Sequence, residues 1–226
     1  MNRESRLIIK VCGITETDTL GQIAEEQLAI DWLGFVFAQS RRRVSAKQWE
    51  ELAAFVPVSY KAAGVFVNPL IQEIEEVFSC APLDIVQLHG EESPAFCRKV
   101  KETFSVPIIK AIGIERSADN WEEMDNYTGA IDYLLLDTMT SSQSGGTGET
   151  FNWNVIPYYK EWCARHGIPL LVAGGIRADN ARSLLTDYAP DGLDVSSSVE
   201  TEGRKDADKI REFVGRMRQY EQHGVK

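Results

Sequence analysis

The chain has 226 residues, a net charge of −10, 43% hydrophobic residues and 26% charged residues, which are the proportions of a globular protein rather than a fibrous or disordered one. The length suffices for one large domain with a full core. The acidic balance argues against passive binding to nucleic acid or to an anionic membrane, so an anionic ligand would need a local cationic or dipolar site.

The ends and the cysteines of the chain indicate where the protein works. Residues 1–6 are polar and carry no signal-peptide core, and the longest stretch without a polar side chain, 167–176, is too short to span a bilayer. The four cysteines form no CxxC pair and no zinc-spaced cluster with histidine, so no metal site is expected. We therefore expect a cytoplasmic protein with free thiols.

Short apolar runs rich in β-branched residues recur along the chain and predict eight strands. These runs are Leu7–Cys12, Trp32–Phe37, Ala62–Val67, Asp84–Leu88, Pro107–Ala111, Tyr133–Asp137, Pro169–Ala173 and Gly192–Val195. Most of the runs are continuous rather than alternating, as in parallel strands whose outer faces are covered.

Helical patterns lie between the predicted strands. Ser45 with Gln48 predicts a capping box, and Ser93-Pro94 predicts an N-cap followed by a first-turn proline. Asn68-Pro69 predicts the same start for the next helix, ahead of an apolar helical face. Further helices are expected at 119–126, 154–165, 178–188 and 206–220.

Strands that alternate with helices over about 220 residues are typical of a (β/α)8 TIM barrel. The alternative is an open doubly wound sheet, which would need a glycine-rich nucleotide fingerprint after the first strand, where the chain has none. No linker or compositional shift appears, so we expect one barrel domain over residues 1–226. The long Ser-, Thr- and Gly-rich segment Thr138–Gly148 is predicted to be a mobile lid.

In such a barrel the chemistry lies where the strands end. Cys12 ends the first strand, and Lys10 shares its face, so a nearby ammonium would favour the reactive thiolate. Asp137 ends an apolar run, where a carboxylate is costly unless it is partnered or used. An acid and a base at one barrel mouth suit proton transfer at carbon. A packed cysteine and a turn-capping aspartate are the structural alternatives, and a buried Lys10–Asp194 pair is the structural alternative for Lys10.

Other strand ends offer groups that could hold anions. Gly174-Gly175 after the seventh strand and Ser196-Ser197 after the eighth are predicted phosphate cradles, because exposed backbone N–H groups attract an anion. The basic run around Arg42 is either a solvated loop or a fork for a substrate carboxylate. Gln87 and His89 share a strand face and are expected to point into the same site.

Taken together, these motifs resemble the phosphoribosylanthranilate isomerase family. The matching segments are KVCGI at 10–14, GFVF at 34–37, SRRRV at 40–44, VFVN at 65–68, VQLHG at 86–90, LD at 136–137, GGTG at 145–148, TF at 150–151 with Trp153, AGGI at 173–176, and DVSS at 194–197 with VE at 199–200. They span almost the whole chain in the family's order.

The resemblance implies an Amadori rearrangement in tryptophan biosynthesis, from N-(5-phosphoribosyl)anthranilate to 1-(2-carboxyphenylamino)-1-deoxyribulose 5-phosphate, without cofactor or metal. By motif position, Asp137 would be the general acid that opens the sugar ring, and Cys12, as thiolate, the general base at C2′. Arg42 would hold the anthranilate carboxylate. The full substrate-binding set implied is Arg42, Gln87, His89, Gly146, Gly174, Gly175, Ser196 and Ser197. The expected partner is this small molecule, with no nucleic acid or membrane, and the protein is expected to be a monomer or homodimer.

Three residues depart from the family pattern: Ser198 replaces a Gly, Asn152 an Asp, and Arg41 a Pro or Lys. Two alternative functions stay open. A histidine-pathway aminoimidazole ribotide isomerase typically has an aspartate where this chain has Cys12, and shows a two-fold internal repeat. A non-catalytic phosphosugar-binding barrel would be expected to have lost either Cys12 or Asp137.

Overall fold

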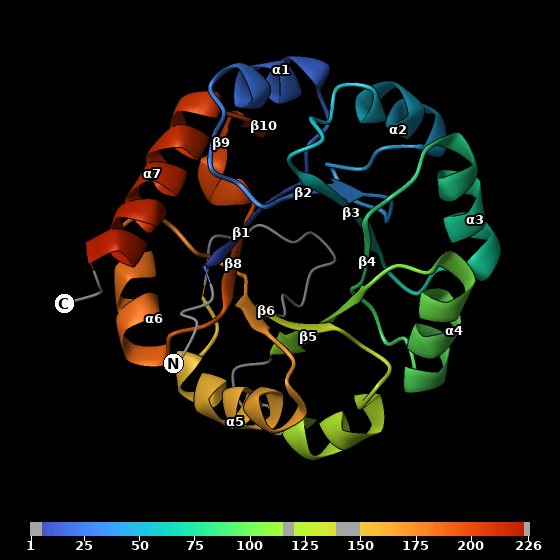
Figure 1. The fold of residues 1–226 in the computed structure, drawn as a ribbon, viewed down its shortest axis with the longest axis vertical. Coiled ribbons are helices and arrows are strands. Elements are labelled where there is room, and N and C mark those ends of the chain that lie inside the picture. Colours follow the sequence, from blue (N-terminus) through green and yellow to red (C-terminus); the bar gives the residue numbers. More distant parts are fainter. Residues whose placement is uncertain (1–5, 115–119, 139–149, 224–226) are drawn as a thin grey trace.

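The computed structural model describes residues 6–114, 120–138 and 150–223, which contain a closed ring of eight parallel strands (Figure 1). Strands pair in chain order, and hydrogen bonds between the first and the eighth strand close the ring. The strands are β1 Ile8–Cys12, β2 Trp32–Val36, β3 Lys61–Phe66, β4 Ile85–Leu88, β5 Ile108–Ile114, β6 Tyr133–Thr138, β7 Leu170–Val172 and β8 Gly192–Val195. The predicted TIM barrel is therefore confirmed, and the open sheet is excluded.

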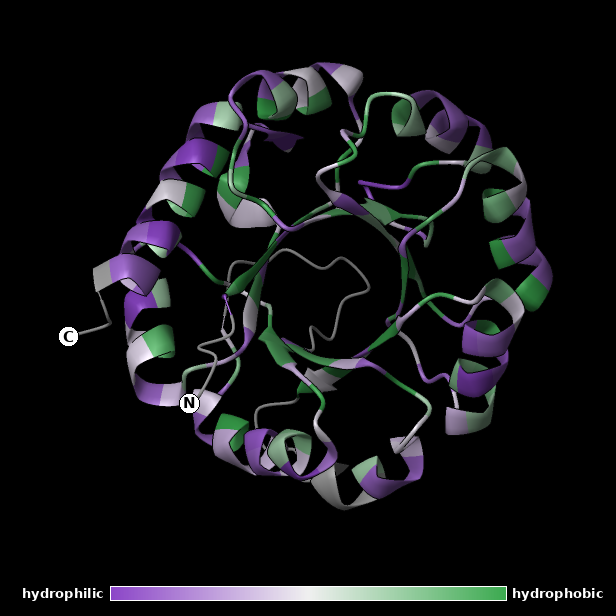
Figure 2. Ribbon diagram, viewed as in Figure 1, coloured by the Kyte–Doolittle hydropathy of each residue, from purple (hydrophilic) through white to green (hydrophobic). Residues whose placement is uncertain are grey.

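Helices surround the ring on its outer side (Figure 1). The α-helices are α1 Thr17–Glu25, α2 Ala46–Ala53, α3 Ile71–Cys80, α4 Pro94–Phe104, α5 Ile156–His166, α6 Ala181–Tyr188 and α7 Ala207–His223. Tighter 3-10 turns are η1 Asn120–Tyr127, η2 Trp153–Val155 and η3 Ser197–Val199. In Figure 2 the strands are mostly hydrophobic, whereas the helices carry hydrophilic residues on their outer sides. Within the described residues no helix is long and apolar enough to cross a membrane.

Alternate strand residues fill the inside of the barrel. Its lower part is a separate apolar cluster that includes Trp32, Ile85, Ile109, Leu135 and Leu171. Toward the carboxyl ends, the same side of β1, β4, β6 and β8 continues with period two into polar residues, whereas β5 and β7 continue with alanine. The apolar layer therefore fills the barrel on the amino-end side of the polar residues.

Four aspartates lie at the opposite, amino end of the strands. Each directly precedes an even-numbered strand and accepts a backbone N–H from the preceding odd-numbered strand. The bonds are Ile9 N–H to Asp31 (2.9 Å), Ala62 N–H to Asp84 (2.7 Å), Ile108 N–H to Asp132 (2.9 Å) and Leu170 N–H to Asp191 (2.8 Å). We call these four the amino-end aspartates.

Two predicted helix starts are confirmed and one is wrong. Ser45 and Gln48 form the reciprocal capping box, and Ser93 accepts the N–H of Phe96 at 3.2 Å with Pro94 in the first turn. Asn68, however, has a left-handed backbone (φ +47°), and its Oδ1 accepts the N–H of Glu91 at 2.7 Å. It therefore ties two loops together, and α3 begins only at Ile71.

Some elements are absent from the sequence-based prediction or begin elsewhere. The first helix, α1, was not predicted; it buries Leu20 and Ile23. The predicted 119–126 helix is the 3-10 turn η1, α5 starts at Ile156 after η2, and α6 starts at Ala181. A two-stranded hairpin, β9 Glu200–Thr201 and β10 Arg204–Lys205, follows β8. Its turn has positive φ at Glu202 (51°) and Gly203 (81°), as in the primed turns that suit hairpins.

Candidate active site

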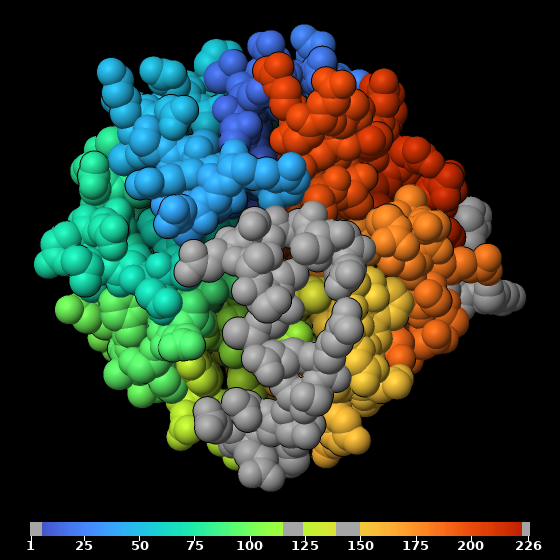
Figure 3. Space-filling model, turned by 180° about the vertical axis from the view of Figure 1, so that it is seen from behind, coloured from blue at the N-terminus to red at the C-terminus, as the bar shows by residue number. Residues whose placement is uncertain are grey.

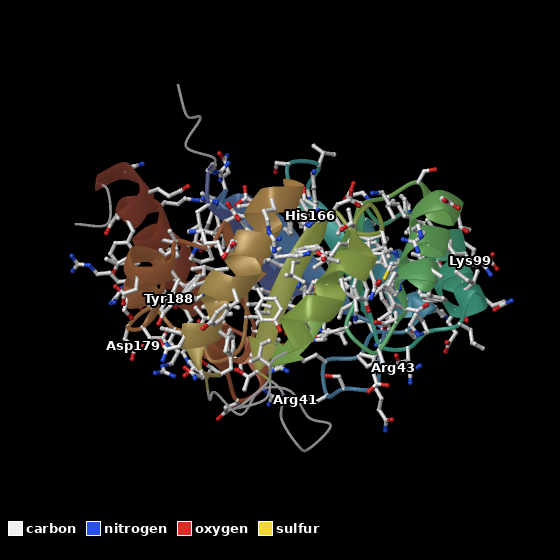
Figure 4. The ribbon with its side chains drawn as sticks, turned by 90° about the horizontal axis from the view of Figure 1, so that it is seen from below. Arg41, Arg43, Lys99, His166, Asp179 and Tyr188 are labelled. Atoms are coloured by element: carbon white, nitrogen blue, oxygen red, sulfur yellow. The ribbon has the colours of Figure 1, made fainter. Side chains whose placement is uncertain are left out.

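Polar side chains gather at the end of the barrel where the strands terminate, which we call the barrel mouth. Figure 4 shows Arg41, Arg43 and Asp179 toward this end of the molecule and His166 toward the other. Arg41 and Arg43 follow β2, and Asp179 follows β7, so this is the carboxyl end of the strands.

Two glycines make room for Cys12 and its neighbour. Gly34 is the residue opposite Cys12 on β2, and a Cβ there would lie 2.8 Å from the Cys12 sulfur. Gly13 has a φ of +86°, and its Cβ would lie 2.4 Å from Cδ of Arg42. Only glycine fits both places, so the Cys12 sulfur can lie over Gly34 and the Arg42 side chain can cross directly over Gly13.

Lys10 lies two residues before Cys12 on β1, so the two side chains share one face of the strand. Its Nζ is 2.7 Å from Oδ2 of Asp194 on β8, and the two side chains are 0% and 6% exposed. Burial lowers the pKa of Lys10, but Asp194 and Cys12 outweigh it, so the pKa lies above its usual value. The structural pair is therefore present, and Lys10 also interacts with Cys12.

The Cys12 thiol is subject to opposing influences. Desolvation by the surrounding protein raises its pKa above the usual value of 9.0, Lys10 lowers it in part, and Asp194 raises it further. Lys205, on β10, is a second ammonium that lowers the pKa of this thiol. The expected effect of Lys10 thus has the right direction, but desolvation is larger.

Asp137, His89 and Gln87 form a second group at the mouth. Oδ2 of Asp137 lies 3.3 Å from Nε2 of His89, and Nδ1 of His89 lies 3.0 Å from Nε2 of Gln87. Oδ1 of Asp137 accepts the N–H of Thr138 at 2.7 Å. A Cβ on Gly174 would lie 2.7 Å from this oxygen, so glycine is required beside the carboxylate.

The two groups share one electrostatic environment. Asp194, the partner of Lys10, interacts electrostatically with both Asp137 and His89. The structure therefore brings together Cys12 and Asp137, the two residues predicted to carry acid–base chemistry, at one end of one barrel.

Arg42 is buried at the edge of the mouth, where it contacts a carboxylate from the distant hairpin. Its Nε lies 2.5 Å from Oε1 of Glu200, and its Nη2 lies 3.0 Å from Oε2. Arg41 donates to Oε2 of the same carboxylate at 2.7 Å. The alternative of a solvated loop is wrong for Arg42, whose side chain is 8% exposed, whereas that of Arg41 is 52% exposed.

The two predicted phosphate cradles lie on neighbouring strands. Gly174 and Gly175, which follow β7, both have positive φ (79° and 63°), a conformation that favours glycine. The Ser196 hydroxyl donates to the carbonyl of Cys12 at 2.9 Å, and Ser197 begins the single turn η3. Neither segment runs directly into an α-helix, because α6 and α7 begin several residues later.

The structure describes the surroundings of Ser198 and Asn152, two of the residues that depart from the family pattern. Ser198 is not among the residues with positive φ, so it adds no backbone strain, and its buried hydroxyl has no hydrogen-bond partner within the described residues. Asn152 caps η2 by accepting the N–H of Asn154 at 3.2 Å. Gly146, and the predicted lid Thr138–Gly148 apart from Thr138, lie outside the described residues.

Glu200 and Lys205 are functional candidates that the sequence did not single out for a role. Both side chains are buried, with 4% and 1% exposed. The available signal was the Glu202-Gly203 turn, which predicts a hairpin and hence the pairing of the residues on either side.

Comparison with known proteins gives a consistent result. Residues 9–216 match the family model described as N-(5'phosphoribosyl)anthranilate (PRA) isomerase. The N-(5'-phosphoribosyl)anthranilate isomerase of Brevibacillus brevis is 44% identical over 215 residues, which cover 95% of this chain and 95% of that protein.

Solved structures show the same similarity. The phosphoribosyl anthranilate isomerase of Thermotoga maritima superimposes with a TM-score of 0.80 and 34% identity, covering 94% of this chain and 99% of that one. A second structure of such an isomerase, in complex with reduced 1-(o-carboxyphenylamino)-1-deoxyribulose 5-phosphate, gives a TM-score of 0.76 at 32% identity, covering 94% of this chain and 99% of that one.

Proposed function

The chain belongs to the N-(5'-phosphoribosyl)anthranilate isomerase family and isomerises N-(5-phosphoribosyl)anthranilate in tryptophan biosynthesis, and from this premise we propose how its residues divide the chemistry. The two alternative functions, a histidine-pathway isomerase and a non-catalytic barrel, are not favoured by these similarities. The reaction needs one acid, one base and anchors for two anions, and the barrel mouth offers candidates for each.

Asp137 is the general acid of the first step. It gives a proton to the furanose ring oxygen, the C1′–O bond breaks, and the nitrogen lone pair forms a Schiff base at C1′. Both carboxyl oxygens have neighbours, Thr138 N–H at 2.7 Å and His89 at 3.3 Å, which fix the direction of the acid. His89 in turn is held by Gln87. These contacts support an acid with one preferred orientation.

Cys12 is the general base of the second step. As thiolate it removes the C2′ proton, and the resulting enolamine tautomerises to the ketone. A pKa above the usual value makes the thiolate a stronger base while lowering the fraction of protein that carries it. Lys10 and Lys205 restore part of that fraction, because both lower the pKa of the thiol.

The two anionic ends of the substrate need separate anchors. Arg42 holds the anthranilate carboxylate: its methylene chain passes over Gly13, the residue after Cys12, and its guanidinium is a fork that matches a carboxylate. The backbone donors of Gly174, Gly175, Ser196 and Ser197 hold the phosphate. We also propose that the protein acts as a monomer or homodimer, which sedimentation equilibrium would test.

The observation that carries this assignment is the position of Cys12 and Asp137 at the carboxyl ends of β1 and β6, joined electrostatically through Lys10 and Asp194. A kinetic isotope effect separates their roles. Substrate with deuterium at C2′ is followed by loss of its fluorescence. Cys12→Ser should show a full primary isotope effect, since proton abstraction becomes limiting, and Asp137→Asn a suppressed one, since ring opening becomes limiting. The reverse pattern would exchange the two roles.

A further inference from the structure

A buried carboxylate surrounded by three cations lies at the edge of the barrel mouth. Oε1 of Glu200 is 2.5 Å from Nε of Arg42 and 2.6 Å from Nζ of Lys205, and Oε2 is 3.0 Å from Nη2 of Arg42 and 2.7 Å from Nη2 of Arg41. We call these four residues the Glu200 cluster. Burial raises the pKa of Glu200, but Arg42 and Lys205 outweigh it, so the pKa lies below its usual value and the carboxylate is charged.

Two distant parts of the chain meet to make this cluster. Glu200 and Lys205 face each other as partners across the β9–β10 hairpin, while Arg41 and Arg42 come from the loop after β2. In Figure 3 the blue segment around residue 40 abuts the red segment around residue 200. Lys209 of α7 donates to the carbonyl of Glu200 at 2.6 Å and so connects the hairpin to this helix.

Lys205 connects the cluster to the proposed phosphate cradle. Its Nζ donates to the carbonyl of Ser196 at 3.0 Å and lies 3.2 Å from the Ser196 hydroxyl. That hydroxyl donates to the carbonyl of Cys12 at 2.9 Å. An unbroken series of short polar contacts therefore joins Arg42, Glu200, Lys205 and Ser196 to the residue that carries the thiol.

Stability alone is a weak reason to keep such a cluster. Burying charged groups costs desolvation energy that their mutual attraction often only balances. Three cations around one carboxylate also leave a formal surplus of two positive charges in a chain whose net charge is −10. A local surplus of this sign is the feature that a substrate with two anionic ends requires.

We propose that Glu200 is a positioning residue for recognition of the substrate carboxylate. Its two oxygens fix the plane of the Arg42 guanidinium, and through Lys205 they fix how far Arg42 lies from the Ser196 loop. The cluster thus sets the spacing between the carboxylate anchor and the phosphate anchor. This inference rests on the proposed role of Arg42.

The test compares two substrates that differ only in the carboxylate, N-(5-phosphoribosyl)anthranilate and N-(5-phosphoribosyl)aniline. Glu200→Gln keeps the shape of the side chain and removes its charge. We expect KM for the anthranilate compound to rise about 10- to 100-fold with little change in kcat, as for a misplaced anchor. KM for the aniline compound should stay at the wild-type value, because that compound has no carboxylate for Arg42 to hold.

Arg42→Lys separates this inference from the role of Arg42 itself. If Arg42→Lys weakens both substrates equally, the carboxylate contact assigned to Arg42 is wrong. If Arg42→Lys is selective for the anthranilate compound but Glu200→Gln is not, the positioning role is overturned. The double variant should lose little more than the worse single variant, since both act on one contact.

Two further variants control for misfolding and for the non-specific effect of removing an ion pair. Glu200→Asp keeps the charge but shortens the side chain, so it should show the same selective loss in KM if the Gln variant does not fold. Asp132→Asn removes the carboxylate of another ion pair, with Lys101 at 2.7 Å, at the amino end of the barrel. It should leave both KM values unchanged. Equal KM increases for both substrates in the Glu200 variants would mean a merely structural role and would refute the proposal.

Discussion

The two ends of the barrel use the same side chain for different purposes. At the amino end, each of the four amino-end aspartates accepts an N–H from the first residues of the preceding strand, at 2.7 to 2.9 Å. At the mouth, Asp137 accepts the N–H of the residue that follows it and turns its other oxygen toward His89. One end completes the backbone hydrogen bonding, whereas the other presents a carboxyl group to a ligand.

The direction of the strands explains this difference. The first N–H groups of β1, β3, β5 and β7 point toward the next strand ahead of its first ladder bond and need an acceptor, which the aspartate before that strand supplies. At the other end the loops splay apart and leave space for a substrate. Substitutions at the amino end should therefore affect the free energy of unfolding, and substitutions at the mouth should affect turnover.

The largest expected effect is at the mouth. Cys12→Ala and Asp137→Asn should each lower kcat by about 10²- to 10⁴-fold, because each removes one of the two proton-transfer groups. Chemical denaturation should show little change in stability. Cys80→Ala, at the end of α3, is the matched control and should keep wild-type turnover. A kcat near that of the wild type in either mouth variant would remove that residue from its role.

Lys10→Met should affect both stability and chemistry, because Lys10 contacts Asp194 and acts on Cys12. Removing one partner of a buried ion pair costs about 3–5 kcal/mol. The pKa of Cys12 should also rise, since the ammonium that lowers it is lost. Urea denaturation measures the first effect, and the pH dependence of Cys12 alkylation measures the second. An unchanged alkylation profile would leave Lys10 as a structural partner only.

A smaller effect is expected at the amino end. Asp84→Ala removes the acceptor of the Ala62 N–H and should lower the free energy of unfolding by about 1–3 kcal/mol, with kcat unchanged. Asp187→Ala, at an exposed position on α6, should cost about 0.5 kcal/mol or less. If Asp84→Ala lowered kcat without lowering stability, the amino end would not be a purely structural region, and the proposed difference between the two ends would be wrong.

The smallest expected effect is on the stability of the protein at low pH. Because the folded-state pKa of Glu200 lies below 4.5, its ionisation contributes stability that is fully present above that pH and is lost as the pH falls through the folded-state value. Glu200→Gln should therefore flatten the loss of stability below about pH 4.5, relative to the wild type. Thermal unfolding at a series of acidic pH values measures this. Parallel curves for the two proteins would contradict it.

The barrel and its reactive strand ends were readable from the sequence because they depend on local patterns. Continuous apolar runs marked the strands, and the chain order of a closed barrel then placed Cys12 and Asp137 at the same end. The prediction of Asn68 as a helix N-cap was wrong because its side chain accepts the N–H of Glu91, which belongs to the loop after β4. Glu200 and Lys205 went unassigned because they lie in a charged stretch that reads as solvated surface. Their burial arises only when the hairpin meets Arg42, 158 positions away from Glu200 along the chain.

Ring closure between β1 and β8 ties activity to completion of the polypeptide. Lys10 and Asp194 are separated by 184 positions, as are the Cys12 carbonyl and the Ser196 hydroxyl. Contacts of such long sequence separation form late, and a ribosome delivers the second partner only near the end of synthesis. A growing chain therefore already carries its cysteine but lacks the partners that surround it in the folded barrel. The proton-abstracting site is assembled only when the last strand and its hairpin dock against the first.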